Sequence, residues 1–247
     1  MAPDVAAAQR FYGSVLGWTF ADTDADYGGY TIAMVDGGAA AGIGPMQAGA
    51  PPAWTLYFAS EDADATAAAI SANGGTVLSP PDDVGPLGRM CIAMDPTGAV
   101  FGVWQAGEHI GAEAVNRPGG LTWEDLRSTA PAAAQAFYTA VFGHRWQPME
   151  MAGPDYGTFH DGAEEPPLGG AGGMMGAPEG TPSHWLVYFG VADADASVDA
   201  VRSGGGTVLA EPFDTPYGRM AAIADPSGAV FWVVEATPGQ EMPDRSG

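Results

Sequence analysis

Hydrophobic and polar residues form short periodic blocks along the chain, and the second half shows them most clearly. Residues 121–127 alternate between apolar and polar positions after Gly119 and Gly120, which predicts a strand. Residues 131–142 carry apolar side chains at helical spacing and stop at Gly143, a residue that favours the end of a helix. The pattern therefore predicts a strand followed by a helix.

The remainder of this half predicts more strands around a second helix. Residues 193–203 are rich in alanine, have apolar positions at helical spacing and run into three glycines, which predicts a helix. Residues 169–176 fit either a glycine-rich strand or a loop. Further strands are expected over 156–160, 185–191, 207–210, 220–224 and 230–235. The predicted order is β-α-β-β followed by β-α-β-β-β, two similar modules that each place one helix against a sheet.

The blocks of the second half repeat those of the first half at a shift of about 130 residues, far longer than a solenoid repeat. Matching residues are Phe11 and Phe137, Trp54 and Trp185, and Asp95 and Asp225. The chain is therefore predicted to be a duplication. We expect domain A over 1–106, a linker over 107–119, domain B over 120–236 and a polar tail over 237–247.

Domain A differs from domain B at its start. Only seven residues precede the helix that contains Phe11, and Pro3 and Asp4 match a strand-to-helix turn, so the first strand of domain A is expected to be missing. Two explanations stay open: the natural start lies upstream, or another segment or chain covers the open sheet edge. Open edges pair readily with other chains, and we therefore include a homodimer among the expected partners.

The charge balance narrows the class of partner. The net charge is −22, and all eight basic residues are arginine. This composition argues against binding to nucleic acid or to an anionic membrane surface, which both require basic residues. Without lysine, a P-loop and a lysine Schiff base are both excluded. A small organic molecule is the expected partner.

The single cysteine, Cys91, lies in an apolar stretch, so no intrachain disulfide can form and we expect a buried thiol in a cytoplasmic protein. No apolar run reaches the roughly 20 residues that span a bilayer. The first residues also lack the basic region of a signal peptide.

Three motifs resemble those of the vicinal oxygen chelate superfamily, which includes glyoxalases, extradiol dioxygenases and bleomycin-resistance proteins. They are the Phe-Tyr-x-x-Val-Leu/Phe-Gly helix, the Gly-Gly-Thr-Val turn into a strand, and Asp-Pro-x-Gly-Ala-Val-Phe. This resemblance implies an α+β fold of tandem glyoxalase-like domains, each built from two βαβββ modules curled into a cup-shaped sheet. It says less about function, because this fold carries several chemistries and plain binding proteins.

The resemblance also implies where metal-dependent members place their His, Gln and Glu ligands. In this sequence the corresponding positions are Trp123, Leu186 and Trp232 in domain B, Thr55 and Gly102 in domain A, Ile43, and the run 169–173. The usual donors are absent, so we expect no metal and no other cofactor. A residual site with His160 and His184 would need a third donor.

Candidate catalytic residues are found in domain B, which holds three of the four histidines. Trp123, Asp125 and Arg127 share one face of their strand, and a carboxylate in a partly apolar cup is suited to general acid or base catalysis. We therefore select Asp125, His160 and His184. The structural alternatives are an Asp125–Arg127 pair and hydrogen-bonded histidines.

An aromatic-lined cup is suited to a flat, apolar ligand. The candidate substrate-binding residues are Trp123, Tyr156, Met174, Tyr188, Tyr217, Arg219 and Trp232. Because Arg219 has a counterpart in Arg89, a structural pairing is its alternative role.

Three functions stay open from the sequence. The first is a metal-independent isomerase, lyase or cyclase that acts on an apolar or aromatic metabolite. The second is a resistance protein that sequesters an antibiotic or toxin, as bleomycin-resistance relatives do. The third is a metal-dependent glyoxalase or dioxygenase, which the missing ligands disfavour.

Overall fold

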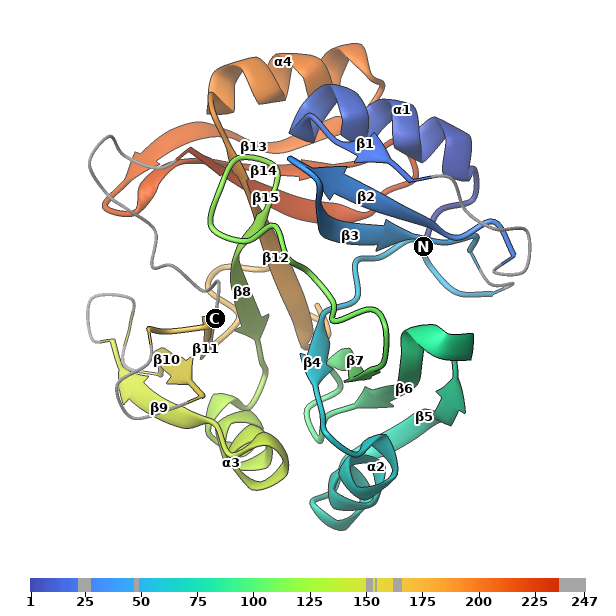
Figure 1. Cartoon of the computed structure of the whole chain (residues 1–247). Helices are drawn as coiled ribbons and strands as arrows, with labels where there is room; N and C mark the ends of the chain where they lie inside the picture. The colour runs from blue at the N-terminus through green and yellow to red at the C-terminus, as the bar shows by residue number, and fades with distance from the viewer. Residues whose placement is uncertain (22–27, 47–48, 150–152, 154, 162–165, 236–247) are drawn as a thin grey trace. The chain divides into compact units, whose positions relative to one another are not determined.

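A computed structural model describes residues 1–235 apart from 22–27, 47–48, 150–152, 154 and 162–165. The predicted tail over 237–247 lies outside the described residues. The fold is α+β with four modules, each of which packs one helix against a sheet, and the predicted class is confirmed (Figure 1).

The chain divides into two compact units, and neither unit coincides with one half of the sequence. Unit 1 contains Met1–Trp54, Ala112–Thr122 and Val187–Gly247, whereas unit 2 contains Thr55–Gly111 and Trp123–Leu186. The first and last modules therefore form unit 1, and the two middle modules form unit 2. The division falls inside two strands, after Thr122 and after Leu186.

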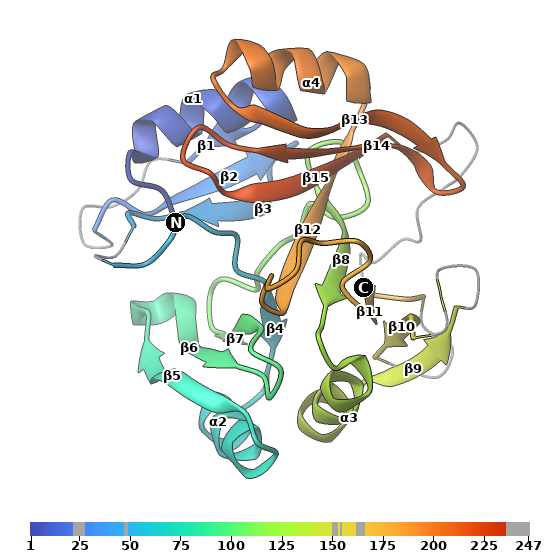
Figure 2. The same cartoon turned by 180° about the vertical axis from the view of Figure 1, so that it is seen from behind.

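Unit 1 has two sheets and one helix from each of its two modules. Its helices are α1 (Val5–Leu16) and α4 (Ala194–Ser203), which lie side by side (Figures 1 and 2). Its strands are β1 (Thr19–Phe20), β2 (Thr31–Val35), β3 (Gly38–Ile43), β13 (Thr207–Thr215), β14 (Gly218–Ala224) and β15 (Val230–Glu235). The order β1-β2-β3 forms one sheet, while β13-β14-β15 continues into a parallel pairing with β12 (His184–Val191).

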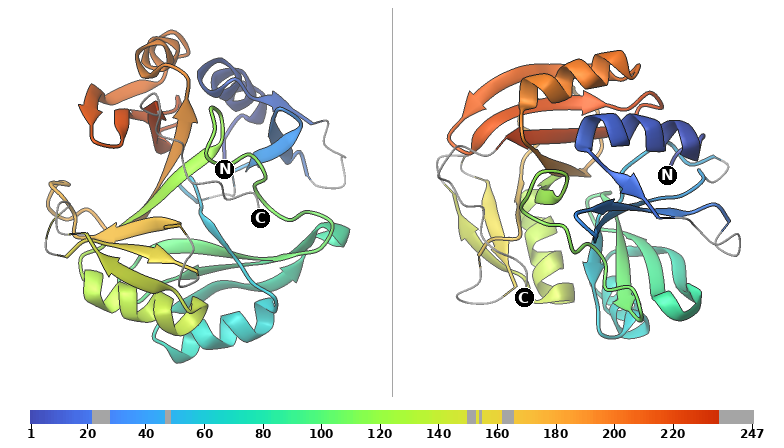
Figure 3. Two further views of the ribbon diagram at one scale, coloured as in Figure 1. Left: turned by 60° about the vertical axis from the view of Figure 1, so that its left-hand side comes forward. Right: turned by 45° about the horizontal axis from the view of Figure 1, so that its top comes forward.

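Unit 2 repeats this plan with α2 (Ala63–Ala72) and α3 (Pro131–Phe142), which also lie side by side (Figure 3). One sheet has the order β4-β7-β6-β5, and the other has β8-β11-β10-β9. The bounds are β4 (Tyr57–Ala59), β5 (Thr76–Asp83), β6 (Gly88–Met94), β7 (Val100–Ala106), β8 (Leu121–Arg127), β9 (Arg145–Pro148), β10 (Gly157–His160) and β11 (Gly169–Gly172).

The predicted helices agree with the structure at their ends. Helix α3 ends at Gly143, whose φ of 76° is in the left-handed region that glycine adopts easily. Helix α4 begins after Asp193, whose side chain accepts a hydrogen bond from Ala196 N at 2.9 Å. The glycine-rich run at 169–176 forms strand β11 over its first four residues.

A buried tyrosine–aspartate hydrogen bond joins the two modules of each unit. In unit 1, Tyr12 Oη donates to Asp225 Oδ2 at 3.0 Å, and in unit 2, Tyr138 Oη donates to Asp95 Oδ2 at 3.2 Å. The tyrosine comes from one sequence copy and the aspartate from the other. Each copy therefore completes the core of a unit that it shares with its counterpart.

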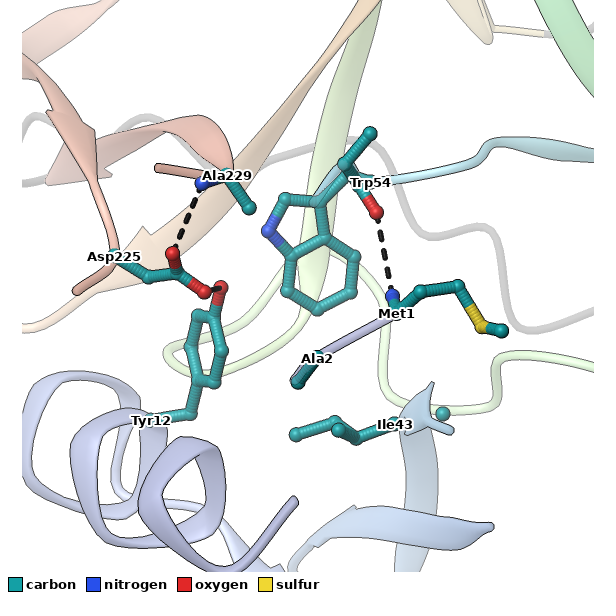
Figure 4. Close-up of a pocket in the computed structure, with 9 residues that line it drawn as sticks. Met1, Ala2, Tyr12, Ile43, Trp54, Asp225 and Ala229 are labelled. Atoms are coloured by element: carbon teal, nitrogen blue, oxygen red, sulfur yellow. Dashed lines mark hydrogen bonds between the residues drawn. The ribbon is translucent and has the colours of Figure 1, made fainter. Parts of the chain in front are cut away.

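Helix α1 is the first element of the chain, and the residues before it form a single bridge. Ala2 pairs in parallel with Pro45. At the corresponding sheet edge of unit 2, the full strand β8 pairs in parallel with β11. Beside this bridge, Met1, Trp54 and Asp225 line a small cavity of about 10 Å³ (Figure 4). Linker residues cover another part of the β3 edge, because the backbone N–H groups of Glu113 and Ala114 donate to Ala39 O.

Candidate functional site

The β8-β11-β10-β9 sheet of unit 2 carries polar side chains on one face and its core on the other. Asp125 pairs with Gly170, and Gly170 pairs with Thr158, so these three residues share a face. Leu126 and Phe159, next in sequence, point to the opposite side and are fully buried. The alternation along 121–127 therefore places Asp125 away from the helix side of the sheet, as predicted for its strand.

Asp125 is a buried carboxylate with a cationic partner. Its exposed fraction is 3%, and Arg127 Nη2 forms an ion pair with Asp125 Oδ2. The side chain of Arg127 is itself only 13% exposed, and its Nη1 lies against Met175 Sδ. A buried pair of this kind costs about 3–5 kcal/mol when one partner is removed, because the other charge is left without compensation. The Asp125–Arg127 pair, expected as the structural alternative, is therefore present.

Tyr156 lies directly on the glycines of β11. A Cβ atom at Gly170 would be 2.0 Å from Tyr156 Oη, and one at Gly172 would be 2.7 Å from Tyr156 Cδ2. Burial raises the pKa of the Tyr156 phenol, and the charge of Asp125 raises this pKa further. The side chains of Trp123 and Asp125 both act on the phenol, that of Trp123 lowering its pKa and that of Asp125 raising it. The hydroxyl group therefore stays protonated beside the carboxylate.

The two candidate histidines have separate hydrogen-bond partners. His160 is buried on the same face as Asp125, and its Nε2 lies 3.1 Å from Thr158 Oγ1. Because β8 and β10 are separated by β11, about 10 Å lies between their backbones. His184, at the start of β12, donates from Nδ1 to Pro182 O at 2.8 Å. Of the two, His160 is the one whose strand register places it on the Asp125 face.

Four of the predicted substrate-binding residues belong to unit 1. Tyr188 stacks on Trp232 with ring centroids 5.5 Å apart, and Phe213 meets Trp232 edge-on. Tyr217 is about half exposed. Arg219 forms ion pairs with Asp195 at 2.6 Å and Asp214 at 2.9 Å, in the same way as Arg89 pairs with Asp64 and Asp83 in unit 2. The alternative structural pairing of Arg219 is thus observed.

The expected metal-ligand positions do not fit a metal. In unit 2, a Cβ at Gly102 would be 2.3 Å from the ring of Tyr57, and Tyr156 covers Gly170 in the same way. Aromatic rings thus occupy the space that carboxylate side chains would need at both positions. Within the described part of the chain, no three His, Cys, Asp or Glu side chains gather into a metal-binding group. The side chains at the expected ligand positions therefore do not supply the nitrogen, oxygen or sulfur donors that divalent metals require.

Tyr156 was a predicted site residue, but its contact with the glycines of β11 was not predicted. Both halves carry the same arrangement, since Tyr30 lies over Gly42 and Gly44 as Tyr156 lies over Gly170 and Gly172. The signal available in the sequence is this repeated combination of a tyrosine and a later Gly-x-Gly pair. No sequence pattern indicates the contact between Arg127 and Met175, because this contact depends on the conformation of the loop after β11.

The Glyoxalase/Bleomycin resistance protein/Dioxygenase superfamily model matches residues 1–103 and 120–233, and the chain belongs to this superfamily. The resemblance seen in the motifs is thus confirmed. In keeping with this, the chain is similar in fold to the Mn(II)-bound glyoxalase from Novosphingobium aromaticivorans, with a TM-score of 0.61, 16% identity, and coverage of 94% of this chain and 78% of that one. It is also similar to the 2,3-dioxygenase LapB from Pseudomonas sp. KL28, with a TM-score of 0.58, 15% identity, and coverage of 99% and 91%.

Two curated proteins are similar over nearly the whole chain. "Putative glyoxylase CFP32" of Mycobacterium tuberculosis is 44% identical over 246 residues, which cover 96% of this chain and 92% of that protein. "Anthracycline biosynthesis protein DnrV" of Streptomyces peucetius is 38% identical over 254 residues, which cover 96% and 91%. Among the described residues, no helix has the length and apolar character needed to cross a membrane.

Proposed function

We propose that the protein binds an apolar or aromatic secondary metabolite on the Asp125 face of unit 2 and catalyses a metal-independent proton transfer. The reaction class is isomerisation, elimination or cyclisation. The observation that carries this proposal is the buried Asp125–Arg127 pair beside Tyr156, where the usual metal donors are replaced. A buried, ionised carboxylate on such a face is suited to act as a general base.

The roles follow from charge and position. The guanidinium of Arg127 favours the ionised form of Asp125, so Asp125 would remove a proton from a carbon atom next to a carbonyl group. His160, on the same face, would carry a proton to or from a more distant part of the substrate. His184 stays a weaker candidate for the same task, because its described bond is to Pro182 O.

The substrate class is supported by the side chains and by one relative. In unit 2, Trp123, Tyr156 and Met174 would contact the apolar surface of a flat molecule. One relative is named for anthracycline biosynthesis, which supports a product of secondary metabolism as the natural substrate. We place the reaction in the cytoplasm because the single cysteine, Cys91, is a buried thiol, and a homodimer remains part of the proposal.

The test uses 2-tetralone, a ketone fused to an aromatic ring, as the probe. The protein should accelerate deuterium uptake from D₂O at the carbon next to the carbonyl, measured by mass spectrometry. Asp125→Asn should reduce this rate to that of buffer. Glu124→Gln is the matched control, because Glu124 is its neighbour on the opposite face of β8 and is also buried. An unchanged rate in Asp125→Asn would contradict the proposal.

A sequestering protein is the second candidate, and an aromatic cluster in unit 1 favours it. Tyr188, Trp232 and Phe213 form an aromatic cluster that would stack on a flat ligand without any proton transfer. Here Trp232→Ala should weaken binding of an anthracycline, followed by fluorescence quenching, and the protein should leave the ligand chemically intact. Deuterium uptake that depends on Asp125 would reject this candidate as the main function.

A further inference from the structure

Tyr156 can lie beside Asp125 because the residues beneath its ring, Gly170 and Gly172, have no side chains. The hydroxyl group lies over Gly170, the residue that pairs with Asp125 in the sheet register. A Cβ atom at Gly170 would come within 2.4 Å of Tyr156 Cζ as well as 2.0 Å of Oη, so even alanine would displace the phenol. Glycine at this position therefore fixes where the hydroxyl group can lie.

The core of unit 2 contains the same three kinds of polar group as the surroundings of Tyr156: an indole, a phenol and a carboxylate. In the core, Trp185 Nε1 donates to Tyr138 Oη at 2.8 Å, and Tyr138 Oη donates to Asp95 Oδ2. On the sheet face, Trp123, Tyr156 and Asp125 bring the same three kinds of group near one another, since the side chains of Trp123 and Asp125 both shift the pKa of the Tyr156 phenol and its hydroxyl group lies over the glycine paired with Asp125.

The two arrangements differ in what holds the carboxylate. Asp95 Oδ1 accepts from Thr97 N at 2.7 Å and from Ala99 N at 3.1 Å, so the backbone of its own turn fixes it. Asp125 is instead paired with the side chain of Arg127. A side-chain partner can adjust when the charge of the carboxylate changes, whereas a backbone turn cannot. The sheet-face copy is thus suited to proton transfer, and the core copy to stability.

We propose that Tyr156 is a catalytic residue, whose hydroxyl group donates a hydrogen bond to the carbonyl oxygen of the substrate while Asp125 removes a proton from the adjacent carbon. This inference rests on the proposed function. Bound metal ions polarise carbonyl oxygens in many enzymes, and a preorganised phenol can do so without a metal. Tyr156 covers a run in which the family resemblance would place a metal ligand.

The step balances without another reactant. The C–H bond breaks, its electron pair forms a C=C bond, and the carbonyl electron pair moves to oxygen. The proton passes to Asp125, which then attracts the phenol hydrogen less strongly than a carboxylate does. The hydrogen bond that Tyr156 donates to the carbonyl oxygen therefore strengthens as that oxygen becomes the enolate oxygen. Transfer of the proton from Asp125 to a second carbon completes an isomerisation.

The experiment compares the full-length protein with Tyr156→Phe and Tyr30→Phe. Tyr30 is the matched control, because its ring lies over Gly42 and Gly44 in unit 1 and the pKa of its phenol is raised by burial, with no carboxylate charge contributing. Deuterium uptake by 2-tetralone and its dissociation constant, from tryptophan fluorescence, are measured for each variant. Tyr156→Phe should lower the exchange rate about 100-fold, the size of effect seen when one oxyanion donor is removed. Its dissociation constant should change less than about twofold, and Tyr30→Phe should exchange at the parent rate.

Each outcome decides between the two proposals. Full exchange in Tyr156→Phe with loss in Asp125→Asn would overturn the role of Tyr156 and leave the proposed function standing. Loss of exchange in neither variant, or no exchange by the parent, would overturn both. If Tyr156→Phe does not fold, Gly170→Ala replaces it, since the added Cβ displaces the hydroxyl group and keeps the phenol. Full exchange in folded Gly170→Ala would equally overturn the inference.

Discussion

At the scale of single residues, corresponding side chains of the two sequence halves can have different contacts. Trp18 in copy A corresponds to His144 in copy B, and both are buried. Trp18 Nε1 donates to Gly119 O at 2.6 Å, whereas His144 stacks on Phe159 with ring centroids 4.8 Å apart. Burial lowers the pKa of His144 to about 4, although the charge of Asp161 opposes this shift. The imidazole therefore stays neutral in the folded protein at any pH near 7.

This neutral histidine predicts a loss of stability in acid. Its pKa is 6.5 as a free group and about 4 when folded, so the unfolded chain binds a proton first as the pH falls. Above pH 6.5 the histidine does not reduce the free energy of unfolding. By pH 4 its protonation in the unfolded chain has lowered this free energy by about 3 kcal/mol. His144→Phe should remove this component, so the urea midpoints of variant and parent should diverge between pH 6.5 and pH 4. Parallel midpoints over this range would contradict the prediction.

At the scale of elements, three of the four α-helices in the described part of the chain begin with a capping aspartate. Asp4, Asp62 and Asp193 each accept a hydrogen bond from the backbone N–H three residues later, at 2.9 Å in every case. Helix α3 begins instead after Ala130, which has no side-chain cap. Its φ of −144° is close to the −154° of Asp193, and its ψ of 72° would have to open toward the 114° of Asp193 to hold a capping side chain in the same way.

Ala130→Asp should therefore stabilise the protein by about 1 kcal/mol, because the carboxylate would satisfy a free N–H group of the first turn. Asp193→Ala should destabilise it by a similar amount. Both changes are measured as shifts in urea midpoint at pH 7, where the slope of the transition should stay constant. A less stable Ala130→Asp variant would show that the start of α3 is held in another way.

At the scale of the whole molecule, the sequence repeat and the compact units divide the chain differently. The repeat groups 1–106 against 120–236, whereas each compact unit takes one module from each half. Tyr12 is bonded to Asp225 and Tyr138 to Asp95, so a separated half would retain both residue types and lose both bonds. Each half would also expose the core face of its modules.

Residues 1–119 and 120–247, produced separately, should consequently fail to give a folded monomer. Produced together, they should associate into a complex that unfolds cooperatively. Size-exclusion chromatography and thermal unfolding of the halves, alone and mixed, provide the measurement. A monomeric, cooperatively folded half would show that the modules of one copy can pair with each other instead.

The sequence predicted the parts of the molecule better than their assembly. The helices at 131–142 and 193–203 follow from local periodicity and glycine stops, and the shared face of Trp123 and Asp125 follows from strand alternation. Strand β9 was missed because Arg145–Pro148 is short and ends in proline. The contact of Tyr156 with the glycines of β11 depends on the strand order β10-β11-β8. Which modules form each unit depends on hydrogen bonds such as that between Tyr12 and Asp225. Neither leaves a local pattern, because the modules resemble one another too closely to show which of them pack together.

The crossed tyrosine–aspartate bonds also bear on how the two copies can diverge. A substitution at Asp95 is expected to remove the hydrogen bond of Tyr138, on helix α3 in the other sequence half. Tyr12, in the same half as Asp95, keeps its hydrogen bond to Asp225. Among relatives, changes at position 95 should thus be accompanied by changes at position 138, and changes at 225 by changes at 12. Gene duplication gave this chain two copies of each part, but the bonds between them mean that the copies evolve as interdependent halves.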